Sequence, residues 1–471
     1  MRITTTLSIL FLLTVALFPQ EKKILTAEEI WKMKRIGAFA VNPAKTEAVF
    51  SVTTFDASKN ESESDLWLLD LGSGAYRKFT SGKGGESTPV WSPDGKKLAF
   101  VAKREGDERG QIYILHRDGG EATRLTEMPL GASSLKWFPD GNKIAFTSNT
   151  FPEAKGDLDT LKKIIKQKKD SKVTAKVTED RFYRYWDSWL TDGYVTHLYS
   201  VDVETGKVTD LTPANEAILN VAGSGASYDI SPTADRIVLT ANVTPKPYFK
   251  DLNFDLFLLD VDGSGKMVNI TPDNPGGDGS PQFSPCGKFV YYLKTVNTNM
   301  VAENAKLARY LISSGKDTIL TAKIDLAFGD FTFDPTTARI YFTTDYRGRT
   351  GIFSVDPNGG DLKKVFAEGT SSGVEADSMM IYFLQNTNTT PQRIVAFDQA
   401  SGKLKELVDL NKDLTSQYKF GKFEEHWYKG ANNDSVQVFL ILPPDFDVNK
   451  KYPMVHLIHG GPHGAFSDDF H

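Results

Sequence analysis

The stretch "WSPDGKKLAFVA" (residues 91–102) occurs again, with the same spacing, as "WFPDGNKIAFTS" (137–148). In each copy an aromatic residue ends one strand, a Pro-Asp-Gly turn follows, and alternating apolar residues form the next strand. Proline restricts φ, and glycine accepts the left-handed conformation that ends such a turn. Weaker copies follow the same plan, at 41–52, 230–241, 283–294, 333–344 and, in degenerate form, 375–386. The chain is therefore built on a repeated β-hairpin.

A second hairpin follows most of these copies, as in "DLWLLDLGSGAYRKFT" (65–80) and "QIYILHRDGGEATRLT" (111–126). Two hairpins in each period of about 40–50 residues are typical of a β-propeller blade, and the pattern resembles the TolB-like propeller repeat. The copies predict seven blades between about Ile36 and Leu410. Closing the strands into a ring hides sheet edges that would otherwise promote aggregation. We therefore predict an all-β, seven-bladed β-propeller that occupies residues 21–413.

The third predicted blade carries an insertion at about residues 151–194. It opens with a helical stretch that contains "LKKIIKQKKD" (161–170), most simply a solvated helix face. It continues with "DRFYRYWDSWLTDGY" (180–194), which is unusually rich in aromatic residues. These aromatic residues either pin the insertion onto the propeller or form a wall that faces a substrate. The second interpretation makes substrate-binding candidates of three residues, Asp187, Trp186 and Trp189, with Asp180 or Glu179 as alternative carboxylates for a cationic substrate group.

Composition excludes several classes of function. The 471 residues include 55 Lys and Arg against 60 Asp and Glu, a formal net charge of −5, so we expect no nucleic-acid partner. Cys286 is the single cysteine, and the seven histidines form no HExxH pattern. His456, His459 and His463 lie close together but span a predicted strand and a glycine turn. We therefore expect neither a metal site nor a cofactor.

The N-terminal sequence "MRITTTLSILFLLTVALFPQEKK" (1–23) has the features of an export signal. Arg2 supplies a positive charge, and an apolar run from Leu7 to Phe18 follows it. The run is short for a transmembrane helix but suits the core of a signal peptide. We predict a signal peptide at residues 1–20, a periplasmic or secreted protein, and no stable membrane insertion after cleavage. An uncleaved anchor is the alternative.

The repeat stops after Leu410, and a different pattern begins. We expect a strand before a polar turn at 430–434, a second strand at 436–442 and a third at 453–459. The run "MVHLIH" (454–459) is nearly all apolar, as in a strand covered on both faces of an α/β sheet. The Gly-Gly-Pro turn that follows leaves backbone N–H groups uncovered. Serine hydrolases of α/β type use such a loop in the oxyanion hole, where one donor contributes about 3–4 kcal/mol.

The stretch "LPPDFDVNKKYPMVHLIHGGPHG" (442–464) resembles the entry to the catalytic domain of the prolyl oligopeptidase family of serine peptidases. In that family a β-propeller precedes an α/β-hydrolase domain, so the resemblance implies that residues 414–471 are the incomplete start of such a domain. It points more narrowly to dipeptidyl peptidase 5-like or acylaminoacyl-peptidase-like members. It also implies that the Gly461 backbone N–H contributes to the oxyanion hole, while His459 shapes the loop and Pro462 stiffens it.

The same resemblance places the nucleophile on a Gly-x-Ser-x-Gly-Gly elbow further along the chain, followed by Asp and then His. We expect no Gly-x-Ser-x-Gly elbow in these residues, since the stretch "GSGAS" (223–227) has the wrong spacing for one. We therefore expect the catalytic Ser, Asp and His to be absent from this chain, which would be an inactive N-terminal fragment. The complete enzyme would be an exported serine peptidase that releases dipeptides or short units from the N-termini of oligopeptides.

The alternative is a non-catalytic β-propeller binding module. Under that interpretation residues 415–471 would form strands with unpaired edges and little core to pack against.

Overall fold

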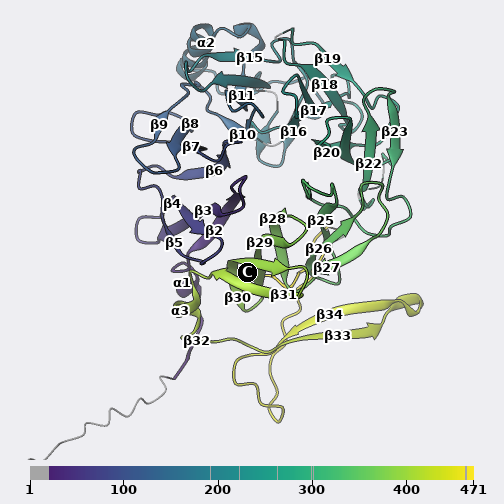
Figure 1. The fold of residues 1–471 in the computed structure, drawn as a ribbon. Coiled ribbons are helices and arrows are strands. Elements are labelled where there is room, and N and C mark those ends of the chain that lie inside the picture. Colours follow the sequence, from purple (N-terminus) through teal and green to yellow (C-terminus); the bar gives the residue numbers. More distant parts are fainter. Residues whose placement is uncertain are drawn as a thin grey trace, which may run out of the picture.

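The fold is a ring of antiparallel β-sheets, seen face on in Figure 1. The structure is a computed structural model that describes residues 21–190, 192–221, 223–262, 264–298, 300, 302–461 and 464–470. The predicted signal peptide at 1–20 lies outside the described residues. Five four-stranded sheets and one eight-stranded sheet, all made of described residues, follow one another around the ring in chain order.

The strands of the first three sheets are β2 (Arg35–Val41), β3 (Glu47–Asp56), β4 (Glu61–Asp70), β5 (Tyr76–Lys78); β6 (Glu86–Trp91), β7 (Lys97–Ala102), β8 (Gln111–His116), β9 (Thr123–Arg124); β10 (Ser133–Trp137), β11 (Lys143–Thr150), β14 (Val195–Asp202) and β15 (Val208–Asp210). Those of the next two are β16 (Tyr228–Ile230), β17 (Arg236–Asn242), β18 (Phe254–Asp260), β19 (Met267–Asn269); β20 (Asp278–Phe283), β21 (Phe289–Lys294), β22 (Lys306–Leu311) and β23 (Lys316–Ile319). Figure 1 shows the first strand of a sheet, such as β10 or β20, nearest the centre of the ring.

The eight-stranded sheet contains β24 (Phe331–Phe333), β25 (Ile340–Asp345), β26 (Thr350–Val355), β27 (Lys363–Phe366), β28 (Thr370–Ala376), β29 (Met380–Thr387), β30 (Thr390–Asp398) and β31 (Lys403–Val408). Its two halves, β24–β27 and β28–β31, are joined where Thr350 pairs in parallel with Thr370. The all-β propeller prediction is confirmed. A count of seven blades requires dividing this sheet between its halves, so the number stays a prediction.

The repeated turn forms as the sequence predicts. In the copy at 91–102 the Gly95 N–H donates to the Ser92 carbonyl at 2.8 Å, and Gly95 has a φ of +68°. The Ser92 hydroxyl donates to Asp94 at 2.6 Å and accepts from the Lys97 N–H at 2.9 Å, which fixes the start of the next strand. The aromatic residue before the turn links neighbouring sheets. The Trp91 indole donates to the Ala40 carbonyl, and the Trp137 indole donates to the Val90 carbonyl, each at 3.1 Å.

The ring closes by side-chain packing rather than by a shared sheet. Among the described residues, no ring sheet combines strands from the start of the ring with strands from its end. Instead, Ile36 and Phe50 of the first sheet pack in one buried cluster with Leu384 and Ile394 of the last sheet. Outside the ring sheets, β1 (Lys23–Ile24) pairs in parallel with β32 (Tyr418–Lys419). The Asn411 side chain also accepts from the Lys34 N–H at 2.9 Å and donates to the Lys34 carbonyl at 2.8 Å.

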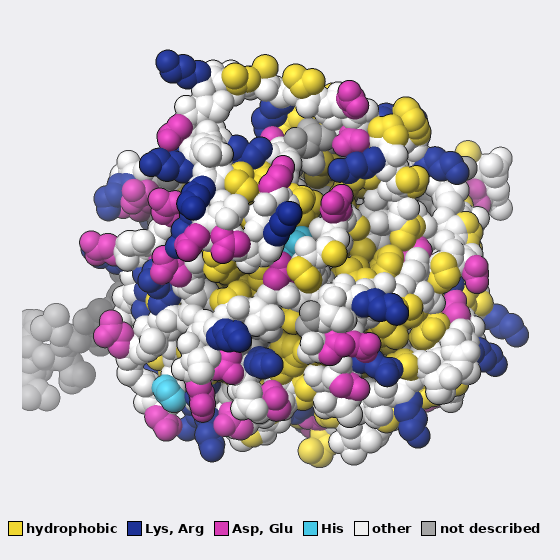
Figure 2. Space-filling model, turned by 90° about the horizontal axis from the view of Figure 1, so that it is seen from above, with side chains coloured by type: hydrophobic (Ala, Val, Ile, Leu, Met, Phe, Trp, Pro, Cys, Tyr) yellow, Lys and Arg dark blue, Asp and Glu magenta, His cyan; other side chains and the backbone are white. Residues whose placement is uncertain are grey.

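The remaining elements lie at the ends of the ring or in its loops. They are α1 (Ala27–Ile30), η1 (Pro152–Ala154), α2 (Leu158–Asp170), β12 (Arg184–Tyr185), β13 (Ser188–Trp189), α3 (Lys412–Thr415), β33 (Phe423–Lys429), η2 (Ala431–Asn433) and β34 (Ser435–Ile441). Within the described part of the chain, no helix is long and apolar enough to cross a membrane. Figure 2 shows acidic and basic side chains interspersed on the side that is uppermost in Figure 1.

One side of the ring collects the irregular segments. Because the strands alternate in direction and the sheets repeat, the connection between second and third strands emerges on the same side of every sheet. We call this side the insertion face. It carries the connections β11–β14, β17–β18, β25–β26 and β29–β30, together with the segments that lead into the innermost strands.

Candidate functional site

The insertion occupies the connection between β11 and β14, as predicted from the break in the repeat. Its helix α2 begins at Asp157, whose side chain accepts from the Thr160 N–H at 2.7 Å. Leu161 is 1% exposed and packs with Phe151 and Ala154, which fixes one face of the helix to the ring. The helical opening of the insertion is thus confirmed, and Lys168 near its end places its ammonium group 4.6 Å from the Phe151 ring centroid.

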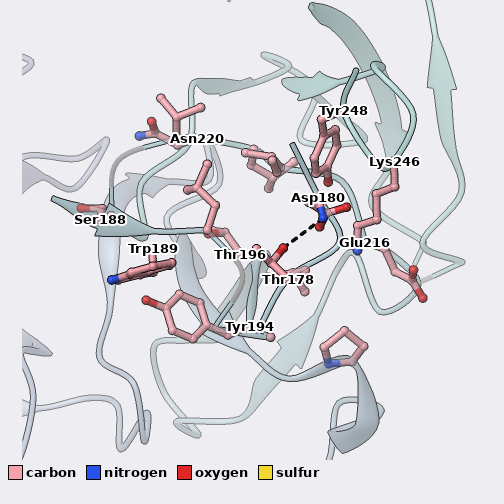
Figure 3. A pocket seen from close by; sticks show the side chains of 18 of the residues that line it. Thr178, Asp180, Ser188, Trp189, Tyr194, Thr196, Glu216, Asn220, Lys246 and Tyr248 are labelled. Carbon is pink, nitrogen blue, oxygen red and sulfur yellow. Dashed lines mark hydrogen bonds between the residues drawn. The ribbon is translucent and has the colours of Figure 1, made fainter. Parts of the chain in front are cut away.

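A pocket of about 520 Å³ lies where the insertion meets two loops of the next sheet (Figure 3). One wall comes from the insertion, a second from the β15–β16 connection and a third from the β17–β18 connection. The polar and aromatic side chains that line it include Thr178, Glu179, Asp180, Ser188, Trp189, Tyr194, Thr196, Glu216, Asn220, Lys246 and Tyr248. We call it the insertion pocket.

Arg181 fastens the insertion to the third wall. Its backbone N–H donates to the Pro247 carbonyl at 2.8 Å, and its guanidinium donates to the Phe249 carbonyl at 2.7 Å. Several of the predicted aromatic residues contact one another, with Tyr183 and Trp189 at 5.5 Å between ring centroids. The attachment therefore depends on these hydrogen bonds, and the pinning of the insertion by its aromatic residues stays a prediction.

The structure separates the three predicted substrate-binding residues. Trp189 lines the insertion pocket. Trp186 and Asp187 form the turn between β12 and β13, where Trp186 is 82% exposed and Asp187 is also exposed. Neither of these two turn residues lines the pocket, so a role for them in binding stays a prediction. The alternative carboxylates, Asp180 and Glu179, do line it.

Charge in the insertion pocket is mostly negative. Glu179, Asp180 and Glu216 contribute carboxylates, and Lys246 contributes one ammonium group. Burial raises the pKa of Tyr248, and the negative charge of Asp180 raises it further. Tyr248 therefore remains a neutral hydroxyl beside the carboxylate at neutral pH. An acidic pocket with aromatic walls suits a small cationic group attached to an apolar body.

The sequence did not reveal Glu216, Lys246 or Tyr248 as site residues. They lie in irregular connections without a motif, on the β15–β16 and β17–β18 loops. The one signal in the sequence was the place of these loops in the repeat. A loop that lies beside a long insertion, on the same face of a propeller, is expected to contact that insertion. That argument needs the ring geometry, which the sequence gives only as a prediction.

The C-terminal segment differs from its prediction in one respect. The hairpin β33–β34 forms as expected, around the turn that contains η2. The predicted strand at 453–459 is wrong, because the structure has no strand there and Met454, Val455 and Ile458 are each about four-fifths exposed. An apolar strand of an α/β sheet forms only against neighbouring strands and covering helices. Among the described residues, none supplies these.

The predicted oxyanion loop follows this exposed segment. Gly461 is exposed, and the exposed His459 makes a local contact from Nδ1 to the Gly460 carbonyl at 3.1 Å. Pro462 lies outside the described residues. The roles of Gly461, His459 and Pro462 therefore stay predictions, and the insertion pocket is the better-defined site.

One Gly-x-Ser-x-Gly match does occur in the sequence, at Gly369–Gly373, and the expectation above missed it. Its serine, Ser371, lies on β28 inside the ring, is 2% exposed, and its hydroxyl has no hydrogen-bond partner in the described part of the chain. A nucleophile elbow instead places an accessible serine on a strand-to-helix turn beside a histidine. The match is therefore coincidental.

Comparison with known proteins agrees with this architecture. The PD40 family, a TolB β-propeller domain, matches residues 53–155. Dipeptidyl-peptidase 5 of Porphyromonas gingivalis is 25% identical over 458 residues, covering 94% of this chain and 64% of that protein. Dipeptidyl-peptidase 5 of Porphyromonas endodontalis is 22% identical, covering 95% and 64%. The chain thus spans a little under two thirds of the length of these curated relatives.

Solved structures show the same fold. The acylaminoacyl peptidase of Pyrococcus horikoshii superposes with a TM-score of 0.70 at 18% identity, covering 94% of this chain and 63% of that one. The β-propeller domain of the trilobed protease from Pyrococcus furiosus, described as having an open velcro topology, superposes with a TM-score of 0.53 at 17% identity, covering 81% and 99%. The chain thus shares the β-propeller fold of these structures. As the motifs predict, these comparisons support a resemblance to peptidases of the prolyl oligopeptidase family.

Proposed function

We propose that the chain is the propeller-bearing part of an exported serine peptidase that releases dipeptides or short units from the N-termini of oligopeptides. The observation that carries the proposal is the similarity to dipeptidyl-peptidase 5 along 94% of the chain, well beyond the propeller repeats alone. The catalytic Ser, Asp and His belong, in this proposal, to sequence outside these 471 residues. A periplasmic or secreted location is part of the same proposal and rests on residues 1–20.

The insertion pocket supports an N-terminal specificity. A peptidase that cleaves a fixed number of residues from the N-terminus has to bind the substrate ammonium group at a fixed distance from the scissile bond. Asp180 and Glu216 offer carboxylates in the pocket, Tyr248 lies near Asp180, and Trp189 adds aromatic surface to another part of the wall (Figure 3). A carboxylate next to apolar walls binds an ammonium group more strongly than one in open water. We assign the substrate ammonium group to these carboxylates.

The chemistry at the peptide bond follows from the family's mechanism. A serine activated by histidine attacks the carbonyl carbon, the histidine takes the serine proton, and the tetrahedral oxyanion accepts hydrogen bonds from backbone N–H groups. In this proposal the Gly461 N–H is one of those donors. Collapse of the intermediate breaks the C–N bond, and the histidine returns its proton to the leaving amine. Water, deprotonated by the histidine, then attacks the acyl-serine ester, and the dipeptide leaves as the serine takes the proton back.

The direct test compares the 471-residue chain with the longer gene product that this proposal requires, which would contain the catalytic Ser, Asp and His. We expect the longer protein to label with a fluorophosphonate and to release dipeptides from substrates with a free N-terminus, while the 471-residue chain does neither. The Asp180→Asn, Glu216→Gln double variant of the longer protein should raise KM at least about tenfold, because a charged contact is lost. Preference for N-acetylated over free amino termini would contradict the assignment of the ammonium group.

A non-catalytic binding module is the second candidate. It predicts that the longer gene product neither labels nor hydrolyses peptides, yet that the 471-residue chain binds short peptides with a free N-terminus. Isothermal titration of the chain with unlabelled tripeptides, alongside the labelling experiment, separates the two functions.

A further inference from the structure

The turn between β25 and β26 joins the propeller to the C-terminal segment. It consists of Tyr346 to Arg349 and lies on the insertion face. Gly348 has a φ of +63°, and a Cβ atom on it would lie 2.5 Å from the Phe439 ring of β34, so a side chain there would displace the hairpin. The Gln437 side chain of β34 donates to the Arg347 carbonyl at 2.9 Å. The turn is thus fitted closely against β33–β34.

Arg349 contacts two parts of the C-terminal segment at once. Its Nη1 lies 2.9 Å from a carboxylate oxygen of Glu425 on β33, and its Nε lies 3.6 Å from a carboxylate oxygen of Asp468. The guanidinium carbon also lies 5.5 Å from the Phe439 ring centroid. One side chain of the propeller therefore holds positions 43 residues apart in sequence, the difference between 468 and 425.

Asp468 attaches the chain to the propeller after the glycine turn. Its side chain is 11% exposed. Its N–H donates to the Gly348 carbonyl at 2.8 Å, its Oδ1 accepts from the Asn388 N–H at 2.9 Å, and its carbonyl accepts from the Thr370 hydroxyl at 3.1 Å. These partners all belong to the propeller. Before this point, residues 453–460 are exposed and form no regular element.

We propose that Arg349 is a positioning residue that holds the segment carrying Gly461 in place against the propeller, through its joint contacts with Glu425 and Asp468. The inference rests on the proposed function, in which Gly461 supplies an oxyanion-hole donor. Gly461 lies between the two contacts in sequence and seven residues before Asp468. Fixing both ends of a loop reduces the conformations available to it, and a donor displaced by about 1 Å loses much of its effect on the transition state.

The first test uses hydrogen exchange of the 471-residue chain and does not depend on activity. In the Arg349→Ala variant, amides in 464–470 and at Asn388 should exchange at least about fivefold faster, because the contacts of Asp468 open more often. Arg393→Ala is the matched control, since Arg393 forms an ion pair with Glu406 in the last sheet at the same side-chain exposure of 21%. Unchanged exchange in Arg349→Ala, or equal acceleration in the control, would overturn the proposal.

The second test uses the longer gene product. Arg349→Ala should lower kcat about tenfold with KM within twofold, because oxyanion stabilisation acts in the transition state and not on substrate binding. Arg349→Lys, which retains the charge without the guanidinium fork, should recover part of kcat. A rise in KM with kcat unchanged would contradict a positioning role toward Gly461. Complete inactivity of the wild-type protein would contradict the proposed peptidase function. The exchange experiment would still show whether Arg349 holds Asp468 against the propeller.

Discussion

At the scale of single residues, the most regular feature of the ring is a buried threonine that ends the second hairpin. Thr80, Thr126, Thr212, Thr271 and Thr321 each accept, at 2.9 Å, from a backbone N–H of the third strand of their sheet. The hydroxyl thus pairs an N–H that lies beyond the end of the short fourth strand. A buried N–H without a partner is costly, which explains why the same residue type recurs in the repeat.

Replacing one of these threonines tests the role of the hydroxyl. Thr212 is fully buried, so Thr212→Val keeps the shape and leaves the Leu198 N–H without its acceptor. We expect the free energy of unfolding to fall by about 1–3 kcal/mol, measured by urea denaturation. Thr212→Ser keeps the hydroxyl, so its free energy of unfolding should fall clearly less than that of Thr212→Val. A valine variant as stable as the wild type would show that the N–H finds another partner.

A buried carboxyl group predicts a pH dependence. Asp278 is 3% exposed, and burial raises the pKa of its carboxyl to about 7. Thr271, Lys294, Asp255 and Asp317 are the neighbouring groups that modify this pKa. Because the folded pKa lies above the unfolded one, the protonated group contributes stability that is complete below about pH 4 and is lost as the pH rises through about 7.

Asp278→Asn removes this titration, since the amide stays neutral. The melting temperature of the variant relative to the wild type should therefore rise between pH 5 and pH 8, by about 2 °C or more. Asp262→Asn, at an exposed turn, is the control and should show no such trend. A constant difference for Asp278→Asn across this range would mean that the carboxyl is charged throughout.

At the scale of elements, the part of the insertion that follows α2 meets the loops of the next sheet. Its hairpin β12–β13 makes no backbone pairing with the ring sheets, and the described contacts with the next sheet include the two hydrogen bonds of Arg181. Arg181→Ala removes the guanidinium contact with Phe249. We expect cleavage after the exposed Lys172 to become about fivefold faster in limited proteolysis, because the insertion detaches more often. Arg184→Ala, on β12, is the control, and an equal effect of both variants would contradict the attachment.

The sequence predicted elements well where local rules decide them. The turns at Ser92–Gly95, the strand pair around 430–434 and the helix at 158–170 all follow from turn chemistry, periodicity and capping. The prediction of a strand at 453–459 was wrong because an apolar run becomes a strand only with partners on its edges and faces. Glu216, Lys246 and Tyr248 were missed because the insertion pocket forms between loops of neighbouring sheets, a placement that no local pattern encodes.

At the scale of the whole molecule, the propeller ring and the C-terminal segment meet on the insertion face. The insertion pocket opens on that face, and the contacts of Asp468 with Gly348, Asn388 and Thr370 lie on it too. Substrate selection by the ring and chemistry next to Gly461 would therefore be carried out on the same side of the molecule. This arrangement supports the proposal that the propeller is part of a peptidase and not a separate module.

The most direct measurement of that claim is mass spectrometry of the products formed when the longer gene product acts on an oligopeptide with a free N-terminus. We expect successive loss of dipeptides from that end, abolished by a fluorophosphonate and absent when the 471-residue chain is used alone. An oligopeptide left intact by the longer protein, under conditions in which it is folded, would contradict the peptidase assignment.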